Sequence, residues 1–265
     1  MRTFTNPAGA TLRYTDNGDG VALLALHGAY STHGEIAGAL EPILAPSEAY
    51  RRIYPDLTGM GDSPAHESIQ TTNDMVSLVE DLVDEVVGAA PLLVVGHSYG
   101  GHIARALAAH RPQQVAGLAL ICPMLPNAMH PEPHVVVTAE SAAIDLVDST
   151  LRDDYASYFV VHTPATARRF NEAVAPSIGW FEADPVARIM EAWAVDPDPD
   201  STLFDKPTLI VTGRRDSITG YRGPMALADE YPRATFVVLA DTGHALPHER
   251  PDVLGALIND WLATI

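Results

Sequence analysis

Cysteine is almost absent from this sequence, with Cys122 the only one among 265 residues. A single cysteine can form neither a disulfide within the chain nor a cysteine metal cluster. Basic residues are also scarce: 16 lysines and arginines stand against 34 acidic residues, Lys206 is the only lysine, and the net charge is −18. Because phosphate backbones and anionic lipid surfaces require a basic face, this balance argues against nucleic acid and anionic membranes as partners.

Long apolar runs are missing as well. No stretch approaches the roughly 20 apolar residues that a membrane-spanning helix requires, and residues 1–7 lack the apolar segment of a secretory signal peptide. We therefore expect a soluble, cytoplasmic protein without a membrane span. The hydrophobic content of 47% is ordinary for a globular chain of this length, which can form one sizeable core with an insertion.

Short apolar runs alternate with amphipathic segments along most of the chain. Segments 2–5 and 10–15 are predicted to form a hairpin around a turn at Asn6-Pro7-Ala8-Gly9. Further strands are predicted at 21–26, 50–54, 91–95, 115–121, 207–212 and 234–240, and helices at 35–44, 75–87, 101–110, 223–231 and 252–263. This alternation predicts an α/β fold, a mostly parallel sheet flanked by helices on both faces.

The alternation breaks down between residues 123 and 200. Four prolines crowd the start of this interval, and a run containing Pro197 and Pro199 closes it. The helical signals in between are short and rich in aromatic residues. We expect a core domain built from residues 1–122 and 201–265 and an inserted helical cap over residues 123–200. The alternative is a set of extra packed helices with no gating role.

The most informative motif is Gly96-His97-Ser98-Tyr99-Gly100, which stands between a predicted strand and a predicted helix. A strand, G-x-S-x-G and a helix in this order are typical of a nucleophile elbow, a strained turn that raises the serine hydroxyl above the sheet. Gly96 and Gly100 would leave room for that turn. The helix that follows directs its positive end toward any negative charge formed beside the serine.

A serine hydroxyl reacts only if a base takes its proton and an acid holds that base in place. After Ser98, the chain offers Asp216 just beyond the next-to-last predicted strand and His244 just beyond the last one. Catalytic groups collect at the carboxyl ends of parallel strands, so these three residues are predicted to lie together. Asp241 is the nearest competitor for the acid, but it is too close to His244 in sequence to be the usual partner.

Together these motifs resemble the α/β-hydrolase fold family. His27-Gly28 after an apolar strand adds to the resemblance, as does the segment 55–63, which is similar to the D-x-x-G-x-G-x-S loop of that family. The resemblance covers nearly the whole chain apart from the cap, and it implies an eight-stranded type of sheet. It also implies Ser98 as the nucleophile, His244 as the general base and Asp216 as the orienting carboxylate.

The same resemblance implies an oxyanion hole made by backbone amides. One donor is the amide of Tyr99, and the second lies in the loop after His27-Gly28, with Ala29 expected and Tyr30 the alternative one residue on. This chemistry needs no metal and no organic cofactor. The histidines show no metal-ligand spacing.

Several polar residues near the motifs are interpreted as structural. His27 is expected to brace the oxyanion loop, and His97 is expected to pack beside Ser98 rather than act as the base. Asp56 and Asp62 are interpreted as hydrogen-bond acceptors that brace their own loop.

These residues predict a serine hydrolase that cleaves a small carboxylic ester or lactone through an acyl-enzyme on Ser98. The expected partner is a small, mostly apolar molecule, and the sequence leaves the oligomeric state open. A substrate pocket between cap and sheet is predicted to be lined by Tyr30, Tyr99, Met124, Leu125, Tyr158, Trp180 and Leu246.

Two other functions are compatible with the sequence. The same triad can hydrolyse a carbon–carbon bond in a vinylogous diketone acid, a substrate whose carboxylate requires a cation. The arginines available for that role are Arg168, Arg169, Arg214, Arg215 and Arg222. The other candidate is a ligand receptor or interaction protein that keeps the fold as a binding module. An intact set of serine, aspartate and histidine argues against it, since a pure binder needs none of them.

Overall fold

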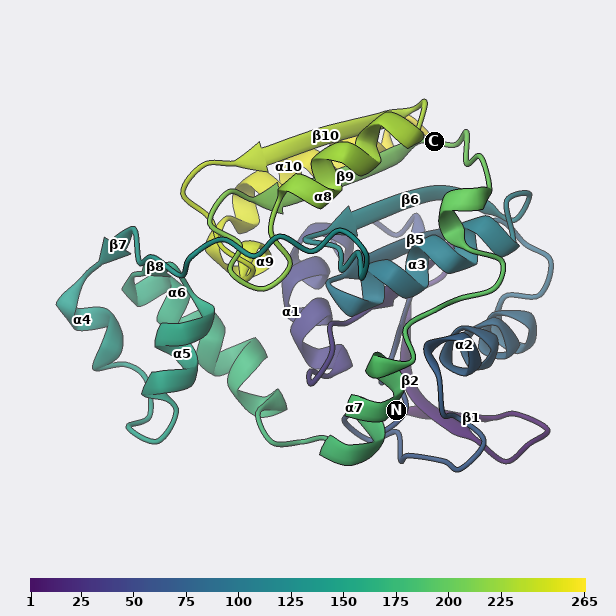
Figure 1. Ribbon diagram of the computed structural model, residues 1–265, viewed down its shortest axis with the longest axis horizontal. Coiled ribbons are helices and arrows are strands. Elements are labelled where there is room, and N and C mark those ends of the chain that lie inside the picture. Colours follow the sequence, from purple (N-terminus) through teal and green to yellow (C-terminus); the bar gives the residue numbers. More distant parts are fainter.

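The computed structural model describes residues 1–265 and contains an eight-stranded sheet with helices on both faces (Figure 1). The strand order is β1-β2-β4-β3-β5-β6-β9-β10. The predicted hairpin forms from β1 (Arg2–Thr5) and β2 (Thr11–Asn17), and β2 also pairs antiparallel with β4. All remaining pairs in this sheet are parallel. The predicted α/β fold with a mostly parallel sheet is confirmed.

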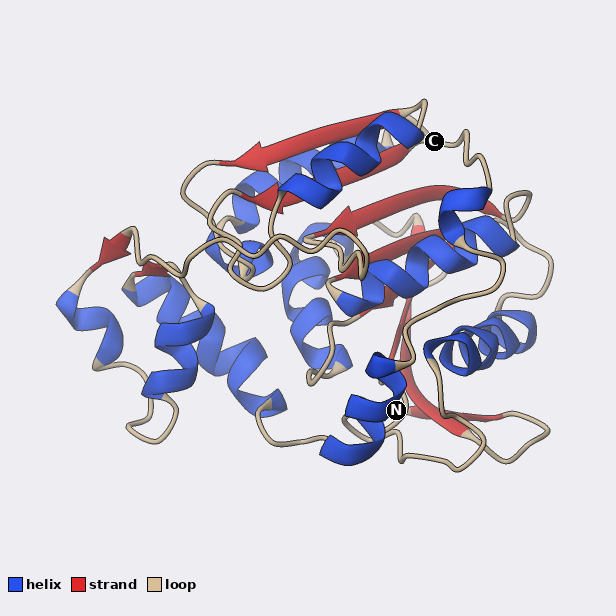
Figure 2. Cartoon of the chain, viewed as in Figure 1, coloured by secondary structure: helices blue, strands red, loops and turns tan.

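The parallel strands lie close to their predicted positions. They are β3 (Val21–Leu26), β4 (Tyr50–Pro55), β5 (Leu92–His97), β6 (Val115–Ile121), β9 (Thr208–Gly213) and β10 (Ala234–Leu239). The residues of β5 and β9 are buried throughout, because helices cover the sheet from both sides (Figure 2). The carboxyl ends of β3, β5, β6 and β9 therefore meet at one protected edge.

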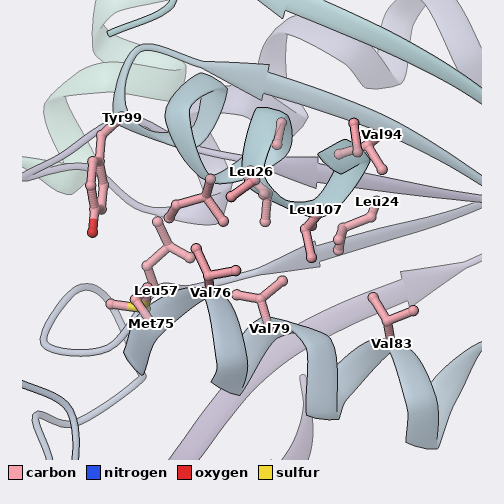
Figure 3. Packing of buried hydrophobic residues seen from close by; sticks show 14 of the residues in the cluster. Leu24, Leu26, Leu57, Met75, Val76, Val79, Val83, Val94, Tyr99 and Leu107 are labelled. Carbon is pink, nitrogen blue, oxygen red and sulfur yellow. The ribbon is translucent and has the colours of Figure 1, made fainter. Parts of the chain in front are cut away.

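Helices α2 (Thr72–Val86), α3 (Tyr99–His110) and α8 (Arg222–Leu227) pack on one face of the sheet. Figure 3 shows Val76, Val79 and Val83 of α2 directed toward the leucines of β3 and α3. Helix α2 begins with a capping box, in which the Thr71 hydroxyl and the Asp74 carboxylate each accept the other residue's amide. The cap defines where the helix begins, and its amphipathic pattern directs one apolar face toward the core.

The opposite face carries α1 (His33–Leu44) and α10 (Pro251–Leu262), which bury a second apolar cluster against the sheet. A short helix, α9 (Leu246–Glu249), precedes α10. No helix of the structure combines the length and apolar character that crossing a membrane requires.

The chain between β6 and β9 leaves the sheet and forms several short elements. They are β7 (Thr138–Ala139), α4 (Ser141–Ile144), α5 (Arg152–Tyr158), β8 (Val161–His162), α6 (Pro164–Arg169), a π-helical turn (Phe170–Val174), α7 (Ala183–Glu191) and 3-10 turns at Ala175–Ser177 and Pro199–Ser201. We call residues 123–200 the β6–β9 segment.

The β6–β9 segment has two parts that pack differently. Its first part, around α4, α5 and α6, projects beyond the sheet in Figure 1 and has a small core of its own that includes Tyr155, Phe159 and Phe170. Its second part returns to the main body, where Val186 and Ile189 of α7 join the core that α2 and α3 share. The division of the chain into a core domain and a cap at residues 123 and 200 stays a prediction.

Candidate active site

Ser98 stands at a sharp turn between β5 and α3, with φ 54° and ψ −118°. A serine pays a steric cost at positive φ, so the surrounding structure must hold it there. The Ser98 amide donates to the carbonyl of Ile121 at 3.0 Å, and its carbonyl accepts from the amides of Gly101 and Met124 at 2.9 and 2.8 Å. These bonds tie the turn to α3 and to the end of β6.

The two glycines of the motif are required sterically. A β-carbon on Gly96 would collide with the carbonyl of Gly100, and one on Gly100 would collide with the carbonyl of Leu26 in the neighbouring strand. The strained strand-to-helix turn predicted for this motif is therefore confirmed.

His244 and Asp216 lie in the loops that follow β10 and β9. His244 Nδ1 donates to Asp216 Oδ2 at 2.8 Å. The same carboxylate accepts from the amides of Ile218 and Thr219, each at 2.9 Å, and from the Thr219 hydroxyl at 2.9 Å. Asp216 is completely buried and His244 is 4% exposed, so water does not compete for these bonds.

The charge of Asp216 is set by these donors. Burial alone would raise the pKa of the carboxyl, but His244 and the two amides lower it by more, so the pKa lies well below its ordinary value. An ionised carboxylate only accepts hydrogen bonds, which places a proton on His244 Nδ1. The Nε2 atom of His244 is then left as an acceptor, the arrangement that a general base needs.

Ser98 and His244 line one cavity of about 370 Å³. Its floor comes from the carboxyl edge of the sheet, including Gly28, Ala29 and Thr219, and its walls come from the β6–β9 segment. A cavity of this size suits a small organic molecule. A larger cavity of about 510 Å³, between α3, α8 and residues 193–200, contains none of the predicted catalytic residues.

Two backbone amides lie next to Ser98 in the chain or in the cavity: Tyr99 follows Ser98 in sequence, and Ala29 lines the cavity. The Tyr99 amide is the first of α3, and neither it nor the Ala29 amide has an acceptor within the protein. The amide of Tyr30 instead donates to the sulfur of Met60 at 3.2 Å. Of the two alternatives from the sequence, Ala29 is thus the residue with an available donor. Gly28 leaves this loop close to the nucleophile, since a β-carbon there would lie 3.2 Å from Ser98 Cβ.

Comparison with known proteins identifies the family of this chain. The sequence model of the alpha/beta hydrolase family matches residues 23–257. The chain belongs to the alpha/beta hydrolase family. An alpha/beta superfamily hydrolase from Oenococcus oeni has the same fold, with a TM-score of 0.89 at 22% identity over 100% of this chain and 99% of the other.

Two relatives of similar length carry different hydrolase names. This hydrolase is 26% identical to 2-hydroxymuconate semialdehyde hydrolase of Pseudomonas sp., over 97% of this chain and 92% of that protein. It is also 26% identical to Lipase 1 of Psychrobacter immobilis, over 92% of this chain and 78% of that protein. The predicted resemblance to the family is confirmed.

The predicted substrate pocket needs correction at four positions. Tyr30, Met124 and Tyr158 line the cavity of this alpha/beta hydrolase as predicted. The other predicted residues do not: Leu125 faces the larger cavity, Trp180 is 47% exposed, Leu246 is buried beneath the sheet, and the Tyr99 ring is buried in the main core (Figure 3).

Two of these differences, at Leu246 and Tyr99, follow from how the helices that carry them pack against the rest of the protein. Leu246 begins α9, whose first turn directs it into the apolar cluster shared with α10. The Tyr99 side chain leaves α3 on the core side, where its hydroxyl lies 3.0 Å from the Thr72 hydroxyl. Side-chain direction on a short helix depends on tertiary packing, which the linear pattern does not contain.

Sequence analysis missed two charged residues of the cavity, Glu35 and the exposed Asp154. Glu35, in the first turn of α1, is only 6% exposed and lines the same cavity as Ser98 and His244. Its Oε1 accepts from the Tyr158 hydroxyl at 2.7 Å, and its Oε2 accepts from the Ser31 hydroxyl. Acidic residues are common in first helical turns, where they stabilise the helix, so the sequence gives no reason to assign Glu35 a role in the site. Its position shortly after the loop that follows β3 was the available signal.

The histidines near the site have structural bonds. His97 Nε2 donates to the carbonyl of His244 at 3.2 Å. Burial, together with the neighbouring His244, lowers the pKa of His97 to about 4, so its ring is neutral near pH 7. His27 Nε2 accepts from the amide of Leu57 at 2.9 Å, and its Nδ1 donates to the carbonyl of Gly28 at 2.7 Å. His27 therefore braces the loop that follows β3. That this loop forms an oxyanion hole stays a prediction.

The loop after β4 is braced by Asp56. Its Oδ1 accepts from the amide and the ring of His33, at 2.7 and 2.8 Å, and its Oδ2 accepts from the amide of Asp62 at 2.9 Å. The predicted bracing role holds for the Asp56 carboxylate, whereas Asp62 contributes its backbone amide.

One group of potential metal ligands occurs in the site. The ligand atoms of His97, Cys122 and His244 lie within 4.8 Å of one another. Burial raises the pKa of the Cys122 thiol well above its ordinary value, while a metal requires the thiolate. His244 Nδ1 is already bonded to Asp216. This donor set is poorly suited to a metal, and catalysis without a metal or cofactor stays a prediction.

Proposed function

We propose that this hydrolase cleaves a small carboxylic ester or lactone, with Ser98 as the nucleophile, His244 as the general base and Asp216 as the orienting acid. The observation that carries the proposal is the shared cavity, in which a strained elbow serine meets a histidine whose Nδ1 is bonded to a buried, ionised carboxylate. An isolated surface histidine or serine would need neither the strain nor the buried partner.

In the proposed reaction, Ser98 Oγ attacks the carbonyl carbon and its proton passes to His244 Nε2. The amides of Tyr99 and Ala29 donate to the carbonyl oxygen as it becomes negative, and each such donor typically lowers the barrier by about 3–4 kcal/mol. The alcohol leaves with the proton from His244, and the acyl group stays on Ser98. Water then loses a proton to His244 and attacks the acyl carbon. The bond to Ser98 Oγ breaks as that oxygen takes the proton back from His244, and the carboxylic acid is released.

Hydrolysis of a carbon–carbon bond is the second candidate, because one relative is named a 2-hydroxymuconate semialdehyde hydrolase. An acidic substrate of that kind requires a cation in the cavity. None of the five candidate arginines lines it, and the charged side chains that do are Glu35 and Asp154. Arg214 and Arg222 instead stack on the ring of Tyr221, each 5.0 Å from its centroid. The charge of the cavity thus favours ester or lactone hydrolysis.

A fluorophosphonate probe tests the proposal directly, because it reacts only with an activated serine. Wild-type protein is expected to label and to hydrolyse 4-nitrophenyl esters, while Ser98→Ala does neither. Ser149→Ala, which changes an exposed serine of the β6–β9 segment, is the matched control and is expected to behave as wild type. Absence of labelling in the folded wild type contradicts the serine mechanism; labelling without ester turnover favours the carbon–carbon bond.

A further inference from the structure

The cavity contains a buried carboxylate that the proposed chemistry does not use. Glu35 is held away from water in the first turn of α1, and it shares the cavity with Ser98 and His244. A carboxylate has about four acceptor positions on its two oxygens. The hydroxyls of Ser31 and Tyr158 occupy two of them. Acceptor capacity therefore remains on a carboxylate that lines the cavity.

No cation in the protein neutralises Glu35. Its two hydrogen-bond donors are neutral hydroxyls, and no lysine or arginine lines the cavity. The nearest ring nitrogen, His248 Nε2, is 3.9 Å from Oε1, too far for a hydrogen bond. Burial also lowers the pKa of both His248 and His97, so neither ring is charged near pH 7.

The carboxyl is nevertheless held in its charged form. Burial raises the pKa of Glu35, but the two hydroxyl donors, and in acid the protonated imidazoles of His97 and His248, lower it by more, so the pKa lies below its ordinary value. The carboxyl is therefore already ionised near pH 7, where both rings are neutral. A buried charge without a counter-charge is costly, and a ligand that supplies the opposite charge removes that cost. The site is therefore incomplete until a donor, above all a positively charged one, enters the cavity.

The position of Glu35 also relates it to the reacting atoms. Its partner Tyr158 comes from α5, and the Tyr158 ring lies 6.1 Å from the His244 ring. The carboxylate is thus separated from the catalytic base by little more than one phenol ring. A substrate with its carbonyl at Ser98 needs only a short chain to reach Glu35 within a cavity of about 370 Å³.

We propose that Glu35 determines which esters this site accepts: its carboxylate binds a hydrogen-bond donor on the substrate, prefers an ammonium group to a hydroxyl, and repels a carboxylate. This inference rests on the proposed ester hydrolysis and refines its expected mostly apolar substrate to one with a polar, donor-bearing end. Glu35 takes no part in bond cleavage in this account. It positions the substrate through the end remote from the carbonyl.

Matched esters that differ only at that end test the proposal. On the alcohol side they are butyl acetate, 4-hydroxybutyl acetate, 4-(dimethylamino)butyl acetate, which is protonated at pH 7.5, and 4-acetoxybutanoate. Because the donor can lie on either side of the scissile bond, ethyl pentanoate and its 5-hydroxy, 5-dimethylamino and 5-carboxylate counterparts form the mirrored series. The quantity compared is kcat/KM within each series.

In wild type, kcat/KM for the ester with an ammonium group is expected to exceed kcat/KM for the apolar ester about tenfold in at least one series. In the same series, kcat/KM for the ester with a free carboxylate group is expected to be about tenfold lower than for the apolar ester. In Glu35→Gln, which keeps the shape and removes the charge, both differences should shrink to about twofold. Glu172→Gln makes the same change at an exposed position outside the cavity and should keep the wild-type ratios.

Unchanged ratios in Glu35→Gln, or an equal loss on all four esters, would mean that Glu35 is only structural and would overturn the proposal. Tyr158→Phe is the second variant, should Glu35→Gln fail to fold. It keeps the charge and removes one competing donor, so the ammonium-to-apolar ratio should rise about threefold; an unchanged ratio contradicts the proposal.

Failure of the catalytic account can be recognised separately. If the wild type hydrolyses no ester, binding of the four acetates to Ser98→Ala, measured by calorimetry, still compares their recognition by Glu35. Tightest binding of the ammonium ester, lost in the Ser98→Ala, Glu35→Gln double variant, supports the role of Glu35 even without turnover. Equal binding of the four esters overturns it.

Discussion

At the scale of single residues, the site depends on buried polar groups that are bonded in one orientation only. Asp216 accepts from His244 and from two amides, which leaves one tautomer of the histidine available. The sequence could predict this pair from chain order and strand ends. It could not predict Glu35, because an acidic residue in a first helical turn has an ordinary explanation, and only the packing of α1 against the cavity shows otherwise.

Asp216→Asn tests the orienting role. An amide nitrogen turned toward His244 favours the tautomer with its proton on Nε2, which cannot accept the serine proton. We expect kcat/KM to fall about 10⁴-fold, with the far-UV circular dichroism spectrum unchanged. Asp241→Asn, which changes the exposed competitor from the same region, should cost less than about threefold. A larger loss at Asp241 would contradict the assignment of Asp216.

His97 makes stability depend on pH. Its pKa is about 4 in the folded protein, against an ordinary value of about 6.5 in the unfolded chain. Between these values the unfolded chain binds the proton more strongly, so the contribution of His97 is complete above pH 6.5 and is lost as the pH falls toward 4. The maximum loss is about 3 kcal/mol.

Urea unfolding at several pH values between 7 and 4.5 measures this effect. His97→Gln should show a shallower fall in the free energy of unfolding than wild type, because one suppressed protonation has been removed. His130→Gln, at an exposed position, should keep the wild-type slope. Parallel curves for wild type and His97→Gln would show that the ring does not resist protonation.

At the scale of elements, the regular strands and helices were predictable and the short ones were not. The predicted strands at 21–26 and 115–121 coincide with β3 and β6. The helix predicted at 223–231 is α-helical only over Arg222–Leu227 and continues as a 3-10 turn to Glu230. Elements of two to seven residues, such as β7 and α5, carry too few turns for any periodicity and depend on their small shared core.

One carboxylate joins the β6–β9 segment to the loop that contains His244. Glu249 accepts from the amides of Val160 and Val161, at 2.6 and 3.2 Å, and from the amide of Gly243 at 2.7 Å. Glu249→Ala leaves three amides without a partner, and each buried amide without an acceptor costs about 1–3 kcal/mol.

We expect Glu249→Ala to lower the free energy of unfolding by at least about 3 kcal/mol and to increase proteolysis within the β6–β9 segment. Glu249→Gln keeps one acceptor oxygen, so its loss should be about half as large. Urea unfolding of wild type and variants measures the change in free energy of unfolding, and limited proteolysis measures cleavage within the β6–β9 segment. Equal stabilities of wild type and Glu249→Ala would contradict this linking role.

At the scale of the whole molecule, the fold follows from the alternation of strands and helices along the chain, and the net charge follows from the amino-acid composition. A mostly parallel sheet could be predicted because strands buried on both faces alternate with amphipathic helices. The way in which the β6–β9 segment divides between its own core and the main core could not be predicted from the sequence. No local pattern specifies which surface a short helix will cover. The net charge of −18 acts on every substrate that approaches.

This charge predicts a salt effect that is separate from Glu35. Raising ionic strength from about 0.02 to 0.5 M screens long-range attraction, so kcat/KM for 4-(dimethylamino)butyl acetate should fall about threefold and that for 4-acetoxybutanoate should rise. Butyl acetate should change little. Because Glu35→Gln removes only one of many charges, it should retain this salt dependence; loss of the dependence in that variant would assign it to the cavity instead of the surface.

The central claim is an acyl group held on Ser98, and intact-protein mass spectrometry after acid quench tests it most directly. During turnover of 4-nitrophenyl butyrate, the account predicts a species heavier by one butyryl group, with the group located on the peptide that contains Ser98. His244→Ala should accumulate this species far more slowly. Hydrolysis that proceeds with no acylated protein, or with the acyl group on another residue, would contradict the account.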